Sequence, residues 1–316
     1  MAIVMPNELN FSNKKFSMIL YGTPGCGKTT TALSAPKPIL IDFDKGISRV
    51  KAYHRTPSIQ CTTYEEVLND IHSDAMKNFE TVVIDTGGSF VTYLQDWAMR
   101  QNPAVNKMKN GQISLKGHGE VKAEFKRFTS YVKDVLNKNI IYVFHSEEQK
   151  DKDGTPQQRL LCEGSAKNIV WQPCDFGGYV QMIDDIRTIS FTPTQEYFAK
   201  GCFGIEGRYN IPVLNDPSVP NDFLTRLFEM ARKNIEDESK IASPEQEIYE
   251  KIIAQARETM PKLTTVDDLN ETAKVFSNMA HVLTSKKETG KMLNDRAKEL
   301  GCKWNKTTKQ YEAVEE

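Results

Sequence analysis

Gly22-Thr23-Pro24-Gly25-Cys26-Gly27-Lys28-Thr29 matches the pattern G-x-x-x-x-G-K-[ST] at every fixed position. The apolar run FSMILY at residues 16–21 precedes it and predicts a buried strand, while residues 28–34 predict a helix. Glycines let backbone N–H groups curl around an anion where a Cβ would intrude, and the N-terminus of the following helix adds partial positive charge. The sequence therefore predicts a phosphate-binding loop between a strand and a helix.

This loop predicts a site for a nucleoside triphosphate and Mg²⁺. Lys28 is expected to reach the β- and γ-phosphates, and the Thr29 hydroxyl is expected to bind Mg²⁺. Thr30 continues the run of residues expected to contact the nucleotide. The chain contains no N-K-x-D guanine motif, and this absence alone favours ATP over GTP.

The segments around the loop predict an α/β fold. Apolar runs at residues 37–43, 81–84 and 139–144 read as buried strands. They alternate with predicted helices over 63–79 and 120–137, the second of which has apolar residues at three- and four-residue steps. This alternation predicts a mostly parallel central sheet that is covered by helices on both faces. Further strands are expected at 179–183, 186–192 and 196–199.

Polar residues end several of these strands. Asp85 closes TVVID and is the expected Walker B carboxylate, which would hold the Mg²⁺. Asp44 is the candidate general base, two residues past Asp42, which lies at the end of the strand after the phosphate-binding loop. Asp42 is the competitor for this role, and solvated turn residues are the alternative interpretation of both. His145 closes NIIYVF at the same edge and is a candidate sensor of the γ-phosphate.

The order of GTPGCGKTT, LIDFD, TVVIDTGG and NIIYVFH resembles the RecA-like ATPase core over roughly residues 16–235. Within that class the chain resembles the phage ATPases of the Sak type. The resemblance implies ATP hydrolysis, binding to single-stranded DNA, a role in annealing or recombination, and homo-oligomers. It also favours Asp44 as the catalytic carboxylate that acts as the base, although a Glu is usual at that place. Thr86 follows Asp85 where AAA+ motors usually carry a Glu.

Two DNA-facing loops are implied by the same resemblance. The first spans 102–119 and, with its flanks, carries the basic residues Lys107, Lys109, Lys116, Lys122 and Arg127. A solvated helix face beside a mobile loop is the alternative interpretation. The second loop spans 146–178 and contains Arg159, Lys150, Lys152 and Lys167. Trp171 in that loop is a candidate for stacking on a base, with a core position as the alternative. The presence or absence of the γ-phosphate would order or release this loop.

Neighbouring subunits of RecA-like oligomers also supply a basic residue across the ATP. Lys200 and Arg208 are the candidates here, with plain surface residues as the alternative.

Residues 236–316 lie outside the resemblance and predict a helical appendage to a domain at 1–235. Ser243-Pro244 and Thr265-x-x-Asp268 resemble helix starts, and Gly301 is expected to end a last helix. The appendage could pack on the ATPase domain, pair with a neighbour, or bind a single-strand-binding protein.

Composition narrows the function classes. The formal net charge is -1 and charged residues make up 26% of 316, so any DNA contact must come from a local basic patch. The sequence shows no membrane span, no signal peptide and no C-x-x-C pair, and we expect a cytoplasmic chain, in the bacterial host if it is phage-encoded. Two rival functions remain: a nucleotide-switched assembly factor without DNA binding, and a packaging or unwinding motor.

Overall fold

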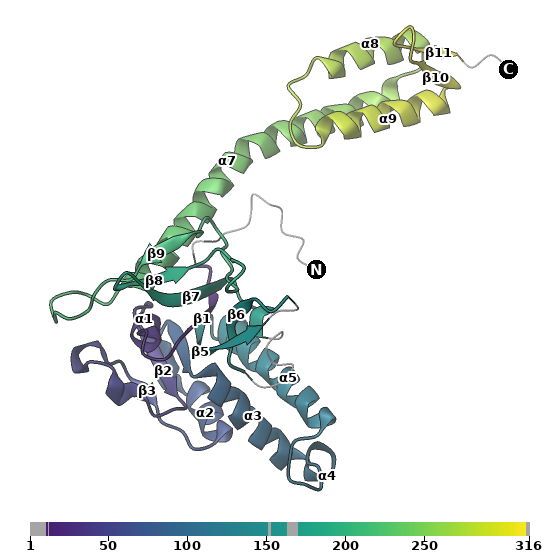
Figure 1. Ribbon diagram of the computed structural model, residues 1–316. Coiled ribbons are helices and arrows are strands. Elements are labelled where there is room, and N and C mark those ends of the chain that lie inside the picture. Colours follow the sequence, from purple (N-terminus) through teal and green to yellow (C-terminus); the bar gives the residue numbers. More distant parts are fainter. Residues whose placement is uncertain (1–10, 12, 151–152, 163–169, 314–316) are drawn as a thin grey trace. The chain divides into compact units, whose positions relative to one another are not determined.

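The protein is described by a computed structural model, which covers residue 11 and residues 13–150, 153–162 and 170–313 (Figure 1). The chain divides into two compact units. One comprises Ser12–Asn234 and the other begins at Ile235. No helix in the described ranges is long and apolar enough to cross a membrane.

The first unit is built on one large sheet. Its strands are β1 (Ser17–Gly22), β2 (Pro38–Asp42), β3 (Ser58–Ile59), β4 (Thr81–Asp85), β5 (Asn139–Lys150), β6 (Pro156–Leu160), β7 (Phe176–Ile183), β8 (Ile186–Ser190) and β9 (Arg208–Asn210). The order is β3-β2-β4-β5-β1-β7-β8-β9, with β6 paired to β5. The pairs from β3 to β7 are parallel, and the others are antiparallel. The expected α/β fold with a mostly parallel central sheet is confirmed.

This strand order brings the important strand ends together. β5 lies between β1 and β4, and its register places His145 beside Gly22 and Val143 beside Asp85. Ligands bind at the carboxyl ends of parallel strands, so the residues after β1, β2 and β4 share one edge of the sheet. All residues of β1 and β4 are buried, because helices cover both faces of a parallel sheet.

The helices of this unit are α1 (Lys28–Ala32), α2 (Tyr64–Ile71), α3 (Gly87–Gln101), α4 (Pro103–Asn106), α5 (Leu115–Ser130) and the first part of α7 (Phe223–Thr259). A layer of aromatic rings joins α3 and α5 to the sheet. Phe90 packs against Phe125, Phe128 and Tyr142, with ring centroids 5.1–6.3 Å apart. This aromatic layer fixes α3, which begins directly after Asp85 and Thr86.

Helix α5 begins earlier than the sequence predicts. Its first residue is Leu115 rather than one near 120, and the Ser114 side chain caps it by accepting a hydrogen bond from the Gly117 N–H at 3.1 Å. The resemblance to RecA-like proteins had implied a loop over 102–119. However, a Cβ at Gly117 would lie 2.6 Å from Ile113 and 2.8 Å from the Asn106 carbonyl, so a helix packed this closely requires glycine.

Two other predictions for this unit are wrong. The loop expected directly after His145 is a continuation of β5, which pairs with β6 as a hairpin through Lys150 and Pro156. The strand expected at 196–199 consists only of isolated bridges at Tyr197 and Lys200. The formation of both segments depends on pairing partners outside the segment itself, so local patterning could not reveal them.

The second unit contains the rest of α7, α8 (Val266–Ser277), α9 (Ser285–Glu299), β10 (Cys302–Asn305) and β11 (Gln310–Ala313). Its core includes Ala256, Leu269, Phe276, Leu293 and Tyr311. The expected helices are confirmed, and Thr265 and Asp268 form the capping box of α8. Gly301, at φ 66°, follows the end of α9. The β10–β11 hairpin was not predicted.

The helix start expected at Ser243 is wrong, because α7 runs without a break through Pro244. Proline is favoured in a first turn since it lacks a backbone N–H, but a long helix can carry it at the cost of one hydrogen bond.

Candidate nucleotide-binding site

The phosphate-binding loop connects β1 to α1 and depends on its glycines. Gly25 and Gly27 have φ values of 80° and 82°, in the left-handed region that favours glycine. A Cβ at Gly27 would also lie 2.6 Å from the Arg187 guanidinium, and one at Gly22 would lie 2.1 Å from the Val180 carbonyl. The backbone conformation therefore requires glycine at positions 25 and 27, and close packing requires it at positions 22 and 27.

A pocket of about 200 Å³ lies against the loop. It gathers the lysine and threonines that begin α1, the carboxylates that follow β2 and end β4, and a histidine from β5. The lining residues are Gly25, Gly27, Lys28, Thr29, Thr30, Asp44, Gly46, Arg49, Val50, Asp85, Thr86 and His145. The residues predicted from the sequence that line this pocket are Gly25, Gly27, Lys28, Thr29, Thr30, Asp44, Asp85 and His145, whereas Gly22, Thr23, Pro24 and Cys26 do not line it.

The two expected Mg²⁺ ligands touch each other. The Thr29 hydroxyl donates to Asp85 Oδ2 at 2.6 Å. Within the described ranges, no group of three or more His, Cys, Asp or Glu residues could hold a metal ion. Mg²⁺ commonly takes only one or two protein oxygens and completes its octahedron with substrate phosphates and water. One hydroxyl and one carboxylate beside a phosphate-binding loop fit that requirement.

Lys28 places a desolvated ammonium in the pocket. The residue is 5% exposed, and its Nζ donates to the Thr23 carbonyl at 2.7 Å. Burial lowers the pKa of Lys28, while the nearby Cys26 and Asp85 oppose that shift. Electrostatic attraction is stronger where water is excluded, so this ammonium is well placed to bind an anion.

Asp85 is also buried, with the opposite consequence for its charge. Burial raises the pKa of Asp85 to about 6, the hydrogen bond from Thr29 opposes the shift, and the charges of Asp44 and Asp42 add to it. A Mg²⁺ ion beside Asp85 would add to the positive charge of Lys28 and would favour the ionised form of this carboxylate.

The structure separates the two candidate bases. Asp42 is 1% exposed and accepts hydrogen bonds from the Gly46 N–H at 2.7 Å and the Ile47 N–H at 2.9 Å. Its carboxylate holds the following turn and does not line the pocket. Asp44 lines the pocket and accepts a hydrogen bond from the Ser89 hydroxyl.

His145 lines the same pocket from within β5. Its Nδ1 is buried and has no hydrogen-bond partner among the described residues. Burial lowers the pKa of His145, and the charge of Lys28 lowers it further, while Asp44 acts in the opposite direction. A neutral imidazole with one unpaired ring nitrogen can accept or donate one further hydrogen bond at this place.

Sequence reasoning did not identify Arg49 or Ser89 as residues of this site. Arg49 lines the pocket from a short 3₁₀ helix, Ile47–Arg49, and Ser89 lies in the first turn of α3. Arg49 follows Asp44 by five residues in a segment without a motif. Ser89 follows TVVIDTGG and could have been suspected from its position at the start of a helix at the sheet edge.

The first basic segment is ordered rather than a long loop. Lys107, Lys109 and Lys116 are exposed around α4, at the end of the α3–α5 pair (Figure 1). Lys122 is half-buried. Arg127 pairs with the carboxylate of Glu124, which is buried and accepts a hydrogen bond from the Tyr64 hydroxyl at 2.6 Å. Arg127 therefore pairs with a buried carboxylate, although its own side chain stays 65% exposed.

Two residues of the second segment, Arg159 and Trp171, pack against aromatic rings outside it. The Arg159 guanidinium lies over the Phe198 ring at 3.7 Å. Trp171 is half-buried and meets Tyr21 edge-on at 6.0 Å, as the alternative core interpretation expected. Lys152 and Lys167 lie outside the described residues.

The two candidate residues for a neighbouring subunit do not line the pocket of their own chain. Lys200 Nζ donates to the Cys174 carbonyl at 2.5 Å, and Arg208 Nε donates to Ser190 Oγ at 3.3 Å. Their action across a subunit interface stays a prediction.

Comparison with known proteins gives three results. A family model described as AAA domain matches residues 14–203. The chain is similar to the SPbeta prophage-derived uncharacterized protein YorG of Bacillus subtilis (strain 168), with 21% identity over 292 residues, or 88% of this chain and 80% of that protein. It is also similar to a solved structure of an ATPase domain, at 11% identity and a TM-score of 0.41 over 64% of this chain and 83% of that one.

Proposed function

The chain belongs to the AAA domain family, and from this premise we propose that it binds and hydrolyses ATP with Mg²⁺. The observation that carries the proposal is the pairing of Thr29 with Asp85 beside the buried Lys28. These three groups are the parts that P-loop enzymes use to hold a triphosphate and its metal. They converge in one pocket with two further titratable groups, Asp44 and His145.

The chain's own residues divide the work as follows. Backbone N–H groups between Gly25 and Thr30 hold phosphate oxygens, and Lys28 neutralises charge on the β- and γ-phosphates. Thr29 and Asp85 hold the metal, which polarises the phosphates and offsets developing negative charge. Arg49 lines the same pocket and adds a cation supplied by the same chain.

Asp44 is the proposed base. It lines the pocket and its position is fixed by the Ser89 hydroxyl, so it can orient a water molecule. Asp42 is less suited to this role, because its own hydrogen bonds use both carboxylate oxygens for the turn. His145 would accept or donate a hydrogen bond near the γ-phosphate and report its presence to the β5–β6 hairpin.

We further propose that the protein acts on single-stranded DNA in annealing or recombination, as a homo-oligomer of the Sak type. The exposed Lys107, Lys109 and Lys116 support this proposal, and so does the similarity to a prophage-derived protein. Phosphate contacts by these lysines make binding weaken as salt rises. Lys200 and Arg208 are the residues we propose to act on the ATP of a neighbouring subunit.

The test is ATP hydrolysis by the purified protein with and without single-stranded DNA, at low and moderate salt. Stimulation that fades with salt supports the full proposal. A Lys107→Glu, Lys109→Glu and Lys116→Glu variant should lose the stimulation and keep basal hydrolysis. Hydrolysis that ignores DNA in the unaltered protein would contradict the DNA role and leave the ATPase role standing.

One observation favours the rival function of a nucleotide-switched assembly factor. Val105, Met108 and Leu115 are exposed around α4, and Leu115 reaches 91%. Exposed apolar side chains in one place are typical of protein interfaces. A protein complex that needs ATP and is lost on Leu115→Ser, with no effect of DNA, would favour this rival. A packaging or unwinding motor is less well supported, because Thr86 stands where such motors usually carry a Glu.

A further inference from the structure

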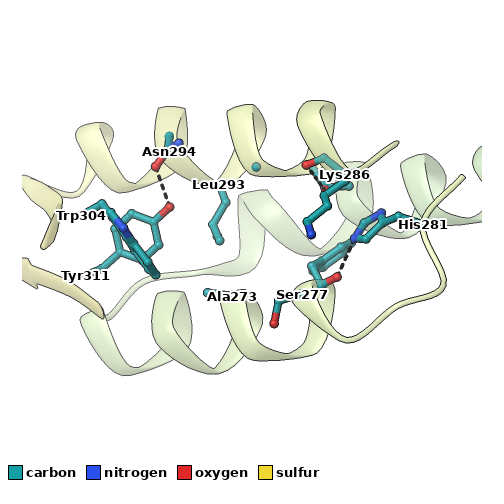
Figure 2. Close-up of a pocket in the computed structure, with 11 residues that line it drawn as sticks. Ala273, Ser277, His281, Lys286, Leu293, Asn294, Trp304 and Tyr311 are labelled. Carbon is teal, nitrogen blue, oxygen red and sulfur yellow. Dashed lines mark hydrogen bonds between the residues drawn. The ribbon is translucent and has the colours of Figure 1, made fainter. Parts of the chain in front are cut away.

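The second unit contains a groove of about 300 Å³ between α8, α9 and the β10–β11 hairpin. Figure 2 shows Trp304 and Tyr311 at one end and His281 at the other, with the two helices as walls. The lining residues are Ala273, Phe276, Ser277, His281, Lys286, Thr289, Gly290, Leu293, Asn294, Trp304 and Tyr311. At Gly290 an added Cβ would meet nothing within 4 Å, so α9 lacks a side chain where one could have filled the groove.

The aromatic end of the groove is held in place. Trp304 and Tyr311 face each other across the hairpin, with ring centroids 5.0 Å apart. The Tyr311 hydroxyl donates to Asn294 Oδ1 at 2.7 Å, and its N–H donates to Asn270 Oδ1 at 2.7 Å. Tyr311 is 4% exposed whereas Trp304 is 42% exposed. A rigidly backed tryptophan therefore presents much of its surface to solvent.

On α9 the lysines stand closer to the groove than the carboxylates do, although Lys298 also pairs with Asp295 at 3.7 Å. Side chains three or four positions apart are neighbours on a helix surface. Lys287 is such a neighbour of Gly290, and both Lys291 and Lys298 are neighbours of Asn294. The three acidic residues of α9 are Glu288, Asp295 and Glu299. None of them stands three or four positions from a groove residue of that helix.

The same rule holds for α8. Lys274 is a neighbour of the groove residue Ser277, while the acidic residues of α8 have no such relation to Ala273, Phe276 or Ser277. Between residues 286 and 309 the chain has eight basic and three acidic side chains, and the basic ones are Lys286, Lys287, Lys291, Arg296, Lys298, Lys303, Lys306 and Lys309. The groove thus has an apolar interior and basic rims.

We propose that this groove binds single-stranded nucleic acid, with a base stacked on Trp304 and phosphates along the lysines of α9. Base stacking on an aromatic ring combined with a basic track is how sequence-tolerant single-strand binders work. A duplex keeps its base faces stacked inside and cannot offer them to Trp304. The inference goes beyond the proposed ATPase and its basic segment, because it assigns a separate site to the second unit.

The spacing of the cations favours a nucleic acid over an acidic peptide. Lys287, Lys291 and Lys298 extend over about 16 Å of helix at roughly 1.5 Å per residue. Charge repeated at that length matches a strand with a phosphate at every nucleotide. A peptide that anchors one apolar side chain in the groove would use only the lysines beside that anchor.

The first test exchanges charge on the rim of the full-length protein. A Lys287→Glu and Lys291→Glu variant is compared with a Lys251→Glu and Lys262→Glu variant, which changes the net charge equally at residues outside α8 and α9. Binding of a fluorescent dT oligonucleotide is measured by fluorescence anisotropy in the absence of ATP. The rim variant should bind at least about 10-fold more weakly, with a salt slope smaller by about 1.4. Equal affinity of the two variants would overturn the proposal.

The second test concerns stacking. Trp304→Leu should weaken dT binding about 5- to 100-fold, whereas Trp304→Tyr should keep most of the affinity because the aromatic face remains. Loss of the same size in both variants would overturn the stacking role. Competition by a duplex or by polyglutamate as effective as that by dT would overturn the assignment to single strands.

The two DNA sites can be separated. The rim variant should keep basal ATP hydrolysis, since none of its residues belongs to the P-loop unit. The variant altered at Lys107, Lys109 and Lys116 should still bind dT through Trp304. If that variant loses all binding and the rim variant loses none, the groove proposal fails and the proposed DNA role of the ATPase unit survives.

Discussion

The P-loop pocket and the C-terminal groove place charge in opposite ways. In the pocket, Lys28 and Asp85 are buried within one small space, and burial shifts the pKa of both. In the groove, the interior is apolar and the lysines stand on exposed rims. Buried charges act strongly on a ligand of fixed shape, whereas exposed charges act weakly and tolerate many ligands. The first region is therefore suited to chemistry and the second to adaptable binding.

The largest effect is expected for Lys28→Ala, which tests whether the P-loop pocket performs the chemistry. Loss of a buried cation at the phosphates should lower ATP hydrolysis by about 100- to 1000-fold, the usual cost of removing one transition-state contact. Steady-state hydrolysis measures the effect, with Lys77→Ala as a control because Lys77 is exposed and far from the motif in sequence. Similar rates for the two variants would remove the P-loop as the site of hydrolysis.

The neighbouring carboxylates give a matched pair. Asp44→Asn should retain nucleotide binding and lower turnover by about 100-fold or more, since a positioned base is lost. Asp42→Asn should instead lower stability by about 1–3 kcal/mol, because the buried oxygens that hold Gly46 and Ile47 are altered. Nucleotide binding, turnover and thermal unfolding are measured for both. Normal turnover in Asp44→Asn would exclude it as the base.

The raised pKa of Asp85 predicts a pH effect. Below a pKa of about 6 this carboxylate is protonated, so a proton competes with Mg²⁺ for it. Mg²⁺-dependent ATP affinity should therefore weaken by up to about 10-fold for each pH unit below the pKa of Asp85, and it should recover above that pKa. In Asp85→Asn this dependence should vanish along with most of the metal dependence. A pH profile shared by both proteins would assign the effect to another group.

The smallest effects are expected for two basic residues, of which Arg127 should contribute to stability and Lys116 to DNA binding. Arg127→Ala leaves buried Glu124 with only the Tyr64 hydroxyl and should cost about 1 kcal/mol of stability. Lys116→Ala should change stability by less than about 0.5 kcal/mol and weaken DNA binding instead. Denaturant unfolding and DNA titration distinguish the two. A large DNA effect for Arg127→Ala at unchanged stability would return it to the binding surface.

The sequence predicted the fold where local signals were strong. The apolar strands, the glycine loop and the capping box at Thr265 all have short-range causes, and each lies where it was expected. The β5–β6 hairpin, the early start of α5 and the β10–β11 hairpin depend on strand pairing and on close packing at a glycine. Local patterning carries no record of such contacts.

The same distinction applies to the site. Lys28 and Thr29 belong to a motif whose spacing is set by the phosphates, and Asp85 ends a buried strand at the same edge of the sheet. Their convergence could therefore be anticipated. Arg49 reaches the pocket through a 3₁₀ turn, and Ser89 reaches Asp44 through the packing of α3. The resemblance favoured Asp44 over Asp42 as the base, but only the fold shows which carboxylate is used by its own turn.

Strand β5 has a mechanical consequence. It runs unbroken from the sheet through His145 to Lys150, and β6 braces its outer half from Ser146 onward. Five residues beyond His145 form an arm of about 17 Å at roughly 3.3 Å per residue. A ladder-bonded pair bends as a unit, so a small rotation of the strand at His145 would become a larger displacement at Lys150. The segment would then act as a stiff arm, where the sequence had suggested a loop that orders and disorders.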